Sequence, residues 1–142
     1  MKSVFLDTNV LIDFLADQEP FSLDAAKLFN YSLSKKIRIY VSAISFNNIY
    51  YILRQRFSHS KCIEMLSDLN EWVEIIDLTN EIITKSLRSG FKDFEDAIQY
   101  NSANAVNLIE FIITRDAKDF KSSSLVILTP KEAISMLRNE FG

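Results

Sequence analysis

Short apolar runs alternate with longer segments of helical periodicity along the whole chain. The runs are rich in Val, Ile, Leu and aromatic residues and lack a polar alternation, which is typical of strands buried on both faces. They span residues 3–6, 38–41, 73–76, 111–114 and 125–128. The pattern therefore predicts about five short strands that need cover on both sides.

The segments between these runs predict helices, and several carry a recognisable start signal. Ser22 precedes an acidic first turn, Thr79 precedes Asn80 and a glutamate, and Pro130 follows a threonine at a first helical position; such residues supply or tolerate the free amides of a helix start. The predicted helices are 10–15, 22–34, 43–57, 60–71, 80–89, 94–107 and 131–139. Strands joined by helical crossovers of the usual right hand give a parallel sheet between helices. We expect one α/β domain, residues 1–142, without repeats or a linker.

The composition indicates the cellular compartment in which such a protein works. Cys62 is the single cysteine, so no disulfide framework is possible, and we expect it to be a semi-buried small hydrophobe. The chain lacks a secretory leader pattern and an apolar stretch long enough to cross a membrane. Its net charge of −3 argues against a general basic coat for nucleic acid. These features predict a soluble cytoplasmic protein without membrane association.

Several enzyme classes are excluded by residues that the chain lacks. Gly90 and Gly142 are the two glycines, so neither a dinucleotide-binding loop nor a P-loop can be built. His59, the one histidine, falls in a predicted inter-helix turn far from Asp7, which argues against a Ser-His-Asp triad. The residue two after Asp7 is Asn9, so the paired aspartates of a phosphatase nucleophile are absent. Carboxylates remain as the candidate chemistry.

Aspartates follow two of the apolar runs and open one predicted helix. Asp7 follows the first run, and Asp116 follows the run at residues 111–114. Asp93 and Asp96 stand at the start of the predicted helix 94–107. Carboxylates gathered at the carboxyl ends of parallel strands suit a hard divalent cation, Mg²⁺ or Mn²⁺. Such an ion neutralises charge on a phosphodiester and activates water, so metal-assisted phosphodiester hydrolysis is the natural reaction class.

Helix capping is the alternative explanation for some of these acids. Asp93 has the position of an N-cap and Asp96 that of its capping-box partner, while Asp119 lies in a short turn that Asp116 would start. Capping is the stronger explanation for Asp93 and Asp119, and both explanations stay open for Asp96 and Asp116. Asp7 is the residue that capping accounts for least.

Four motifs in order resemble those of PIN domains. They are Leu6-Asp7-Thr8-Asn9-Val10-Leu11-Ile12-Asp13, Val41-Ser42-Ala43-Ile44-Ser45, Asp93-Phe94-Glu95-Asp96-Ala97 and Thr114-Arg115-Asp116 before Phe120. The similarity runs from about residue 2 to 130, and the first motif is the most specific.

This resemblance implies a PIN-like three-layer α/β/α sandwich with a central parallel sheet of about five strands and an acidic pocket for Mg²⁺ or Mn²⁺. Many small members are ribonucleases, commonly the toxin half of VapBC-type toxin-antitoxin pairs, often dimeric and inhibited by a small antitoxin protein. The family's metal-binding aspartates fall on Asp7, Asp96 and Asp116. Auxiliary positions of this chain are Asp93, Asp119, Thr8, Asn9, Thr114 and Arg115.

One position departs from the family pattern. The second acidic residue of the family, usually a glutamate in the helix after the second strand, falls on Asn48. Its amide lies on a largely apolar helix face and needs a partner. An amide oxygen can ligate a cation or orient a water, but it cannot act as a general base and it removes one negative charge.

The sequence thus predicts a metal-dependent endoribonuclease with catalytic residues Asp7, Asp96, Asp116 and Asn48. The alternative is a catalytically weakened PIN-like module that binds RNA or a protein partner without cleavage, and a phosphatase acting on small phosphoesters is a weaker third hypothesis. Single-stranded or looped RNA is the expected substrate. Tyr50, Tyr51 and Arg54 are either RNA contacts or part of a core or dimer interface.

Overall fold

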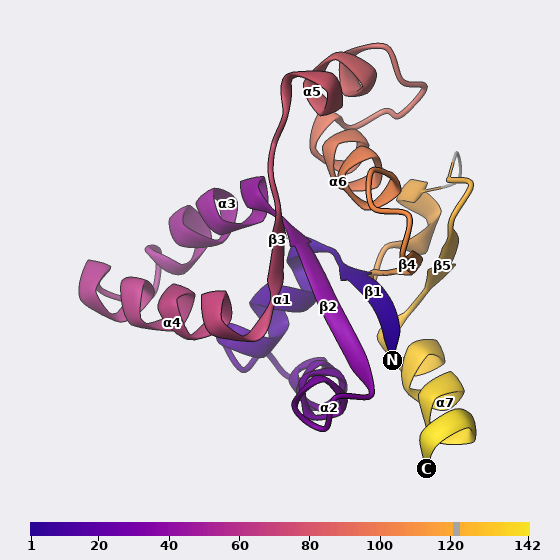
Figure 1. The fold of residues 1–142 in the computed structure, drawn as a ribbon. Coiled ribbons are helices and arrows are strands. Elements are labelled where there is room, and N and C mark those ends of the chain that lie inside the picture. The colour runs from indigo at the N-terminus through magenta and orange to yellow at the C-terminus, as the bar shows by residue number, and fades with distance from the viewer. Residues whose placement is uncertain (121–122) are drawn as a thin grey trace.

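A five-stranded, entirely parallel sheet forms the centre of the molecule (Figure 1). The computed structural model describes residues 1–120 and 123–142. The strands lie in the order β3-β2-β1-β4-β5. Their bounds are Lys2–Leu6 (β1), Ile37–Ser42 (β2), Glu74–Ile76 (β3), Ile109–Ile113 (β4) and Val126–Leu128 (β5). All five predicted strands are present.

Helices cover both faces of this sheet. Their bounds are Thr8–Leu15 (α1), Ser22–Leu33 (α2), Ala43–Leu53 (α3), His59–Trp72 (α4), Asn80–Leu87 (α5), Phe94–Asn104 (α6) and Pro130–Phe141 (α7), with a 3-10 turn at Ala117–Phe120 (η1). In Figure 1, α3 and α4 lie on one side of β1 and β2, and α5 and α6 lie on the other. No helix in the described part of the chain is both long and apolar enough to span a membrane.

The central strand β1 shows why both faces need cover. Val4, Phe5 and Leu6 are all fully buried, and successive side chains of a strand point to opposite faces. Val4 and Leu6 join the core made with α1 to α4 and α7, whereas Phe5 joins a second core made with α5, α6 and η1. The predicted three-layer α/β/α sandwich is therefore confirmed.

The chain changes direction across the sheet at β1. From β1 it adds β2 and β3 on one side, then returns to add β4 and β5 on the other, so β1 and β4 are neighbours. Leu6 pairs with Ile113, and the Asp7 amide donates to the Ile113 carbonyl at 3.0 Å. Open α/β sheets bind ligands at the carboxyl ends of strands beside such a switch point. Asp7 stands at this position.

Helix boundaries differ from prediction mainly at their ends. Helix α3 stops at Leu53 rather than at residue 57, because the Gln55 and Arg56 amides bond three residues back, to Ile52 and Leu53, in a tighter turn. The Arg54 guanidinium donates to the Phe57 carbonyl across this turn at 2.8 Å. Helix α6 stops at Asn104, not 107. His59 lies at the start of α4 rather than in the turn, since Ser58 caps that helix.

The predicted helix starts are confirmed in part by the structure. Thr79 and Asp93 are N-caps with side-chain hydrogen bonds, and Pro130 is the first residue of α7. Ser22 is not a cap, because it is already inside α2 and Phe21 precedes it without a side-chain bond. Cys62 packs as a small hydrophobe, but it is fully buried rather than semi-buried.

Candidate active site

Asp7 is a buried carboxylate held by two donors. It follows β1 in extended conformation and is the N-cap of α1, where its Oδ1 accepts from the Thr8 amide at 2.7 Å. Its Oδ2 accepts from the Thr114 hydroxyl at 2.8 Å. The side chain is fixed from both strands that meet at the switch point, and 6% of Asp7 is exposed.

The residues after β4 form a second hydrogen-bonded group beside Asp7. Thr114 is fully buried, and its hydroxyl accepts from the Asp116 amide at 3.1 Å. The Asn9 amide nitrogen lies 3.3 Å from the Thr114 hydroxyl and 3.4 Å from Asp116 Oδ2, while its oxygen accepts from the Arg115 amide at 3.3 Å. Asn9 thus links the first turn of α1 to the exposed Asp116 carboxylate.

Thr8 carries a third group of polar side chains, on the α6 side of Asp7. Its hydroxyl lies 2.8 Å from the Ser45 hydroxyl and donates to Glu95 Oε2 at 3.2 Å. The Gln99 amide nitrogen donates to Thr8 at 2.9 Å and to Ser45 at 3.0 Å. This cluster joins α1, α3 and α6 inside the protein.

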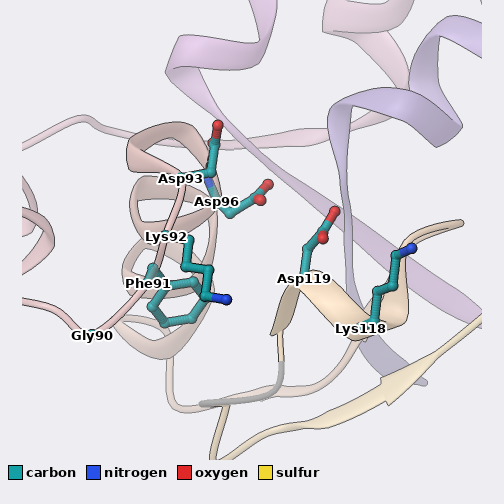
Figure 2. A pocket seen from close by; sticks show the side chains of 7 residues that line it. All are labelled: Gly90, Phe91, Lys92, Asp93, Asp96, Lys118 and Asp119. Atoms are coloured by element: carbon teal, nitrogen blue, oxygen red, sulfur yellow. Dashed lines mark hydrogen bonds between the residues drawn. The ribbon is translucent and has the colours of Figure 1, made fainter.

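Asp96 faces a pocket of about 240 Å³ between α6 and η1. Figure 2 shows its carboxylate directed toward Asp119, with Lys92 and Lys118 at the edges. Asp93 also lines this pocket, and its Oδ1 accepts from the Asp96 amide at 3.0 Å. Asp93 is therefore an N-cap, but the return bond of a capping box is not formed there. The Asp96 carboxylate stays available to the pocket, and Asp119 shares that pocket rather than capping a helix.

Burial shapes the electrostatics of Asp7. It raises the pKa of Asp7 from 3.8 to about 6, against the hydrogen bonds from Thr114 and Thr8, which lower it. The negative charges of Glu95 and Asp116 raise this pKa further. Asp7 thus lies within the field of carboxylates on both of its sides.

The pKa of Asp96 is raised in the same way as that of Asp7. Desolvation raises its pKa from 3.8 to about 7, and the charges of Asp7, Asp93, Asp119 and Glu95 add to the shift. Like charges that raise one another's pKa values are a common feature of functional sites. A cation placed among them would relieve the repulsion.

Arg115 points away from these acids. Its Nε donates to Asp13 Oδ2 at 2.6 Å and its Nη2 to Asp13 Oδ1 at 3.3 Å, and the guanidinium lies 4.1 Å from the centre of the Phe21 ring. The Asp13 side chain is 1% exposed, so this pair neutralises a buried charge at the end of α1. The first motif of the chain therefore contains a structural aspartate as well as Asp7.

The remaining predicted residues lie on α3. Asn48 is half-buried, and its amide makes no hydrogen bond within residues 1–120 and 123–142. Tyr50 is half-buried and its hydroxyl lies 2.8 Å from His59 Nδ1, whereas Tyr51 is 65% exposed. Asn48 follows Ser45 by three residues and so lies on the same side of the helix, one turn further along.

Sequence reasoning missed Glu95 and Gln99 as parts of this site. Glu95 stands next to Asp96 in the sequence, but it faces a different side of α6. The sequence spacing could have indicated their role, because Gln99 follows Glu95 by four residues and both therefore share one helix face. Gln99 is fully buried, and its Oε1 is the one buried side-chain polar atom without a partner among the described residues.

The donor set has the chemistry that Mg²⁺ and Mn²⁺ prefer, because it consists of carboxylate, amide and hydroxyl oxygens. No group of three acidic, histidine or cysteine side chains in the described residues forms a ready-made coordination shell. Mg²⁺ commonly takes one or two protein carboxylates and keeps several waters. Asp7 with Asp96 or Asp116 would therefore suffice, and the mutual repulsion of these groups favours a cation.

The structure is an all-parallel α/β sandwich with a buried carboxylate, Asp7, at its switch point and further acids beside it. Comparison with known families identifies the class of protein. The family model of the PIN domain matches residues 3–118. This chain belongs to the PIN domain family. Comparison with curated proteins gives no significant match.

Several solved structures with the same fold are toxins or toxin-antitoxin complexes. A toxin-antitoxin complex from Klebsiella pneumoniae is 22% identical with a TM-score of 0.66, covering 89% of this chain and 97% of the other. VapBC2 from Rickettsia felis, bound to a promoter DNA fragment, is 18% identical with a TM-score of 0.68, covering 89% and 98%. VapC20 from Mycobacterium tuberculosis, a toxin that cleaves the sarcin-ricin loop, is 15% identical with a TM-score of 0.61, covering 77% and 86%.

Proposed function

We propose that this chain is a metal-dependent endoribonuclease and the toxin component of a VapBC-like toxin-antitoxin system. The observation that carries the proposal is the placement of Asp7. It is buried at the carboxyl end of β1, held by Thr8 and Thr114, and repelled by carboxylates on both of its sides. A purely structural N-cap has no need of such an arrangement, whereas a cation site does.

Asp7, Asp96 and Asp116 are the residues that would hold Mg²⁺ or Mn²⁺. When bound, such an ion supplies a Lewis acid that neutralises negative charge on the phosphodiester and favours ionisation of water. Thr114 and the Thr8 amide keep Asp7 oriented, and Asn9 lies within 3.4 Å of Asp116. These contacts fix the carboxylates before substrate arrives, which lowers the cost of assembling the site.

The pocket between α6 and η1 fits a phosphate backbone. Lys92 and Lys118 are exposed at its edges and can meet phosphates on either side of the one that is cut. Single-stranded or looped RNA is the proposed substrate, because its phosphates reach a recessed site more easily than those of a duplex. In-line attack by water would break the bond to the 3′ oxygen and leave a 5′-phosphate.

The same proposal includes a protein partner. The structures similar to this chain include toxin-antitoxin complexes, which supports a small antitoxin as inhibitor. Exposed apolar side chains on α3 and α4, Tyr51, Ile52 and Ile63, offer surface for that partner or for a second copy in a homodimer. A toxin of this kind acts on cellular RNA, so we place it in the cytoplasm.

The direct test is incubation of the purified protein with a mixed single-stranded RNA pool in Mg²⁺, Mn²⁺ or chelator. We expect fragments with 5′-phosphates only when a divalent ion is present. Production of the protein in a bacterial host should arrest growth, and co-production of its antitoxin should restore it. Cleavage that persists in chelator would contradict a metal-dependent mechanism.

A non-cleaving PIN module that binds RNA or a protein is the second candidate function. Asn48 favours this function, because the family usually has a glutamate at that position and asparagine carries no carboxylate. The absence of a ready-made set of three ligands in the described residues favours it as well. RNA binding that survives Asp7→Asn, without cleavage in either ion, would make this the leading function.

A further inference from the structure

We propose that Glu95 supplies the acidic group that position 48 lacks, so that the site takes its fourth carboxylate from α6 instead of α3. This inference rests on the metal site of the proposed function and assigns a further residue to it. Asn48 is neutral, whereas Glu95 reaches the same polar cluster from the neighbouring helix. With Asp7, Asp96 and Asp116, Glu95 thereby keeps the number of acidic residues that the family pattern has.

The contact that places Glu95 runs through Thr8. The Thr8 hydroxyl donates to Glu95 Oε2 at 3.2 Å, and the Thr8 amide donates to Asp7 Oδ1 at 2.7 Å. One residue thus holds both carboxylates, one through its side chain and one through its backbone. Glu95 is therefore fixed beside the residue that is central to the site.

Gln99 donates to the same Thr8 hydroxyl that bonds Glu95. It lies one turn after Glu95 on α6, is fully buried, and gives its amide nitrogen to the hydroxyls of Thr8 and Ser45. With the amide protons directed at these two oxygens, the Thr8 proton is free to point at Glu95. In this arrangement Glu95 Oε2 accepts a hydrogen bond from the Thr8 hydroxyl.

The position of Ser45 connects this cluster to Asn48. Ser45 lies one turn before Asn48 on the same side of α3, and it is 2.8 Å from Thr8. A glutamate at 48 would therefore extend from the helix face that the cluster already contacts. Glu95 approaches the same region from α6.

Neighbouring residues on α6 face different surroundings. Consecutive helical residues are about 100° apart, so Asp96 faces the pocket with Asp119 while Glu95 faces Thr8. The negative charge of Glu95 acts on both Asp7 and Asp96. Glu95 is itself half-buried, so its charge adds repulsion at both carboxylates that a bound cation would offset.

Calorimetric titration of Mn²⁺ into the purified protein tests the proposal without relying on cleavage. The variants are Glu95→Gln, Asn48→Glu and the double variant, with Glu74→Gln as an exposed control and Asp7→Asn as a reference for loss of the site. Glutamine keeps an oxygen that can accept from Thr8, so Glu95→Gln removes the charge and spares the hydrogen bond. Thermal unfolding of each variant without metal shows that the fold is intact.

We expect Glu95→Gln to weaken Mn²⁺ binding about tenfold or more, as loss of a partner close to a metal typically does. Asn48→Glu in that background should restore the affinity, and Glu74→Gln should leave it unchanged. An acid in a first helical turn also complements the helix dipole, but that role does not alter metal affinity.

Two results would overturn the proposal, and they differ. If Asp7→Asn abolishes Mn²⁺ binding while Glu95→Gln binds as the wild type does, the metal site stands and Glu95 is not part of it. If the wild type binds no Mn²⁺, the metal site of the proposed function fails, and the role of Glu95 fails with it.

Discussion

The Thr114 hydroxyl donates to Asp7 Oδ2 at 2.8 Å and joins the end of β4 to the end of β1. These two residues are 107 positions apart in the chain and meet because their strands are neighbours at the switch point. The bond favours the charged form of Asp7 and lowers its pKa against the larger effect of burial. It therefore helps to keep Asp7 ionised near neutral pH.

Replacement of Thr114 by valine should raise the pKa of Asp7 above about 6, because this hydrogen bond to the carboxylate is lost. Carbon-13 NMR of the aspartate carboxyl groups, followed through a pH titration, measures the change. Thr79→Val is the matched control, since it removes the cap hydroxyl of α5 instead. An unchanged Asp7 pKa in Thr114→Val would contradict the structural account of this site.

Stability should fall as the pH rises through the acidic range in the absence of metal. The pKa values of Asp7 and Asp96 are raised from 3.8 to about 6 and about 7, so the folded state holds protons that the unfolded state has lost. Their stabilising protonation is complete below about pH 4 and is lost as the pH rises through these values. For Asp7 the loss is about 3 kcal/mol.

Urea unfolding from pH 4 to 8 measures this slope, with Asp7→Asn as the comparison. Asparagine does not ionise in this range, so the variant should gain stability relative to the wild type as the pH rises. A wild type whose advantage over Asp7→Asn grows toward pH 8 would contradict the raised pKa.

Metal binding should compete with these same protons. A cation requires deprotonated carboxylates, so Mn²⁺ affinity should rise between about pH 5 and pH 8 and binding should release protons. Titration calorimetry in buffers of different ionisation enthalpy counts the protons released. Affinity that is independent of pH would place the ion away from Asp7 and Asp96.

Arg115 should matter for stability through Asp13. Arg115→Ala leaves the Asp13 side chain buried and unpaired, and we expect a loss of about 3 kcal/mol, the low end for such pairs because Arg115 is 30% exposed. Lys131→Ala breaks an ion pair with Asp24 from a side chain that is 85% exposed and should cost less than about 1 kcal/mol. Equal losses in urea unfolding would contradict a structural role for the Asp13–Arg115 pair.

The strands could be predicted from sequence because burial on both faces leaves an unbroken apolar run. Val4, Phe5 and Leu6 are such a run, and all three are fully buried. Helix ends were less predictable, since they depend on local bonds. The Gln55 and Arg56 amides bond three residues back beyond the end of α3, and apolar periodicity alone does not reveal those bonds.

The site could be predicted in part. Asp7 follows directly from its place after a buried strand, but the partners of a polar side chain depend on which strands and helices become neighbours. Arg115 pairs with Asp13 rather than facing the pocket, and Glu95 meets Thr8 across 87 positions of sequence. Such pairings come from the order of strands in the sheet, which a local pattern does not contain.

The most direct test of the central claim is cleavage of a labelled single-stranded RNA pool by the wild type and by Asp7→Asn, with Mn²⁺ or chelator. Circular dichroism confirms that both proteins are folded, and Thr79→Val serves as a variant altered elsewhere. We expect Mn²⁺-dependent cleavage by the wild type and by Thr79→Val, and none by Asp7→Asn. Equal cleavage by Asp7→Asn, or its persistence in chelator, would contradict a metal-dependent nuclease centred on Asp7.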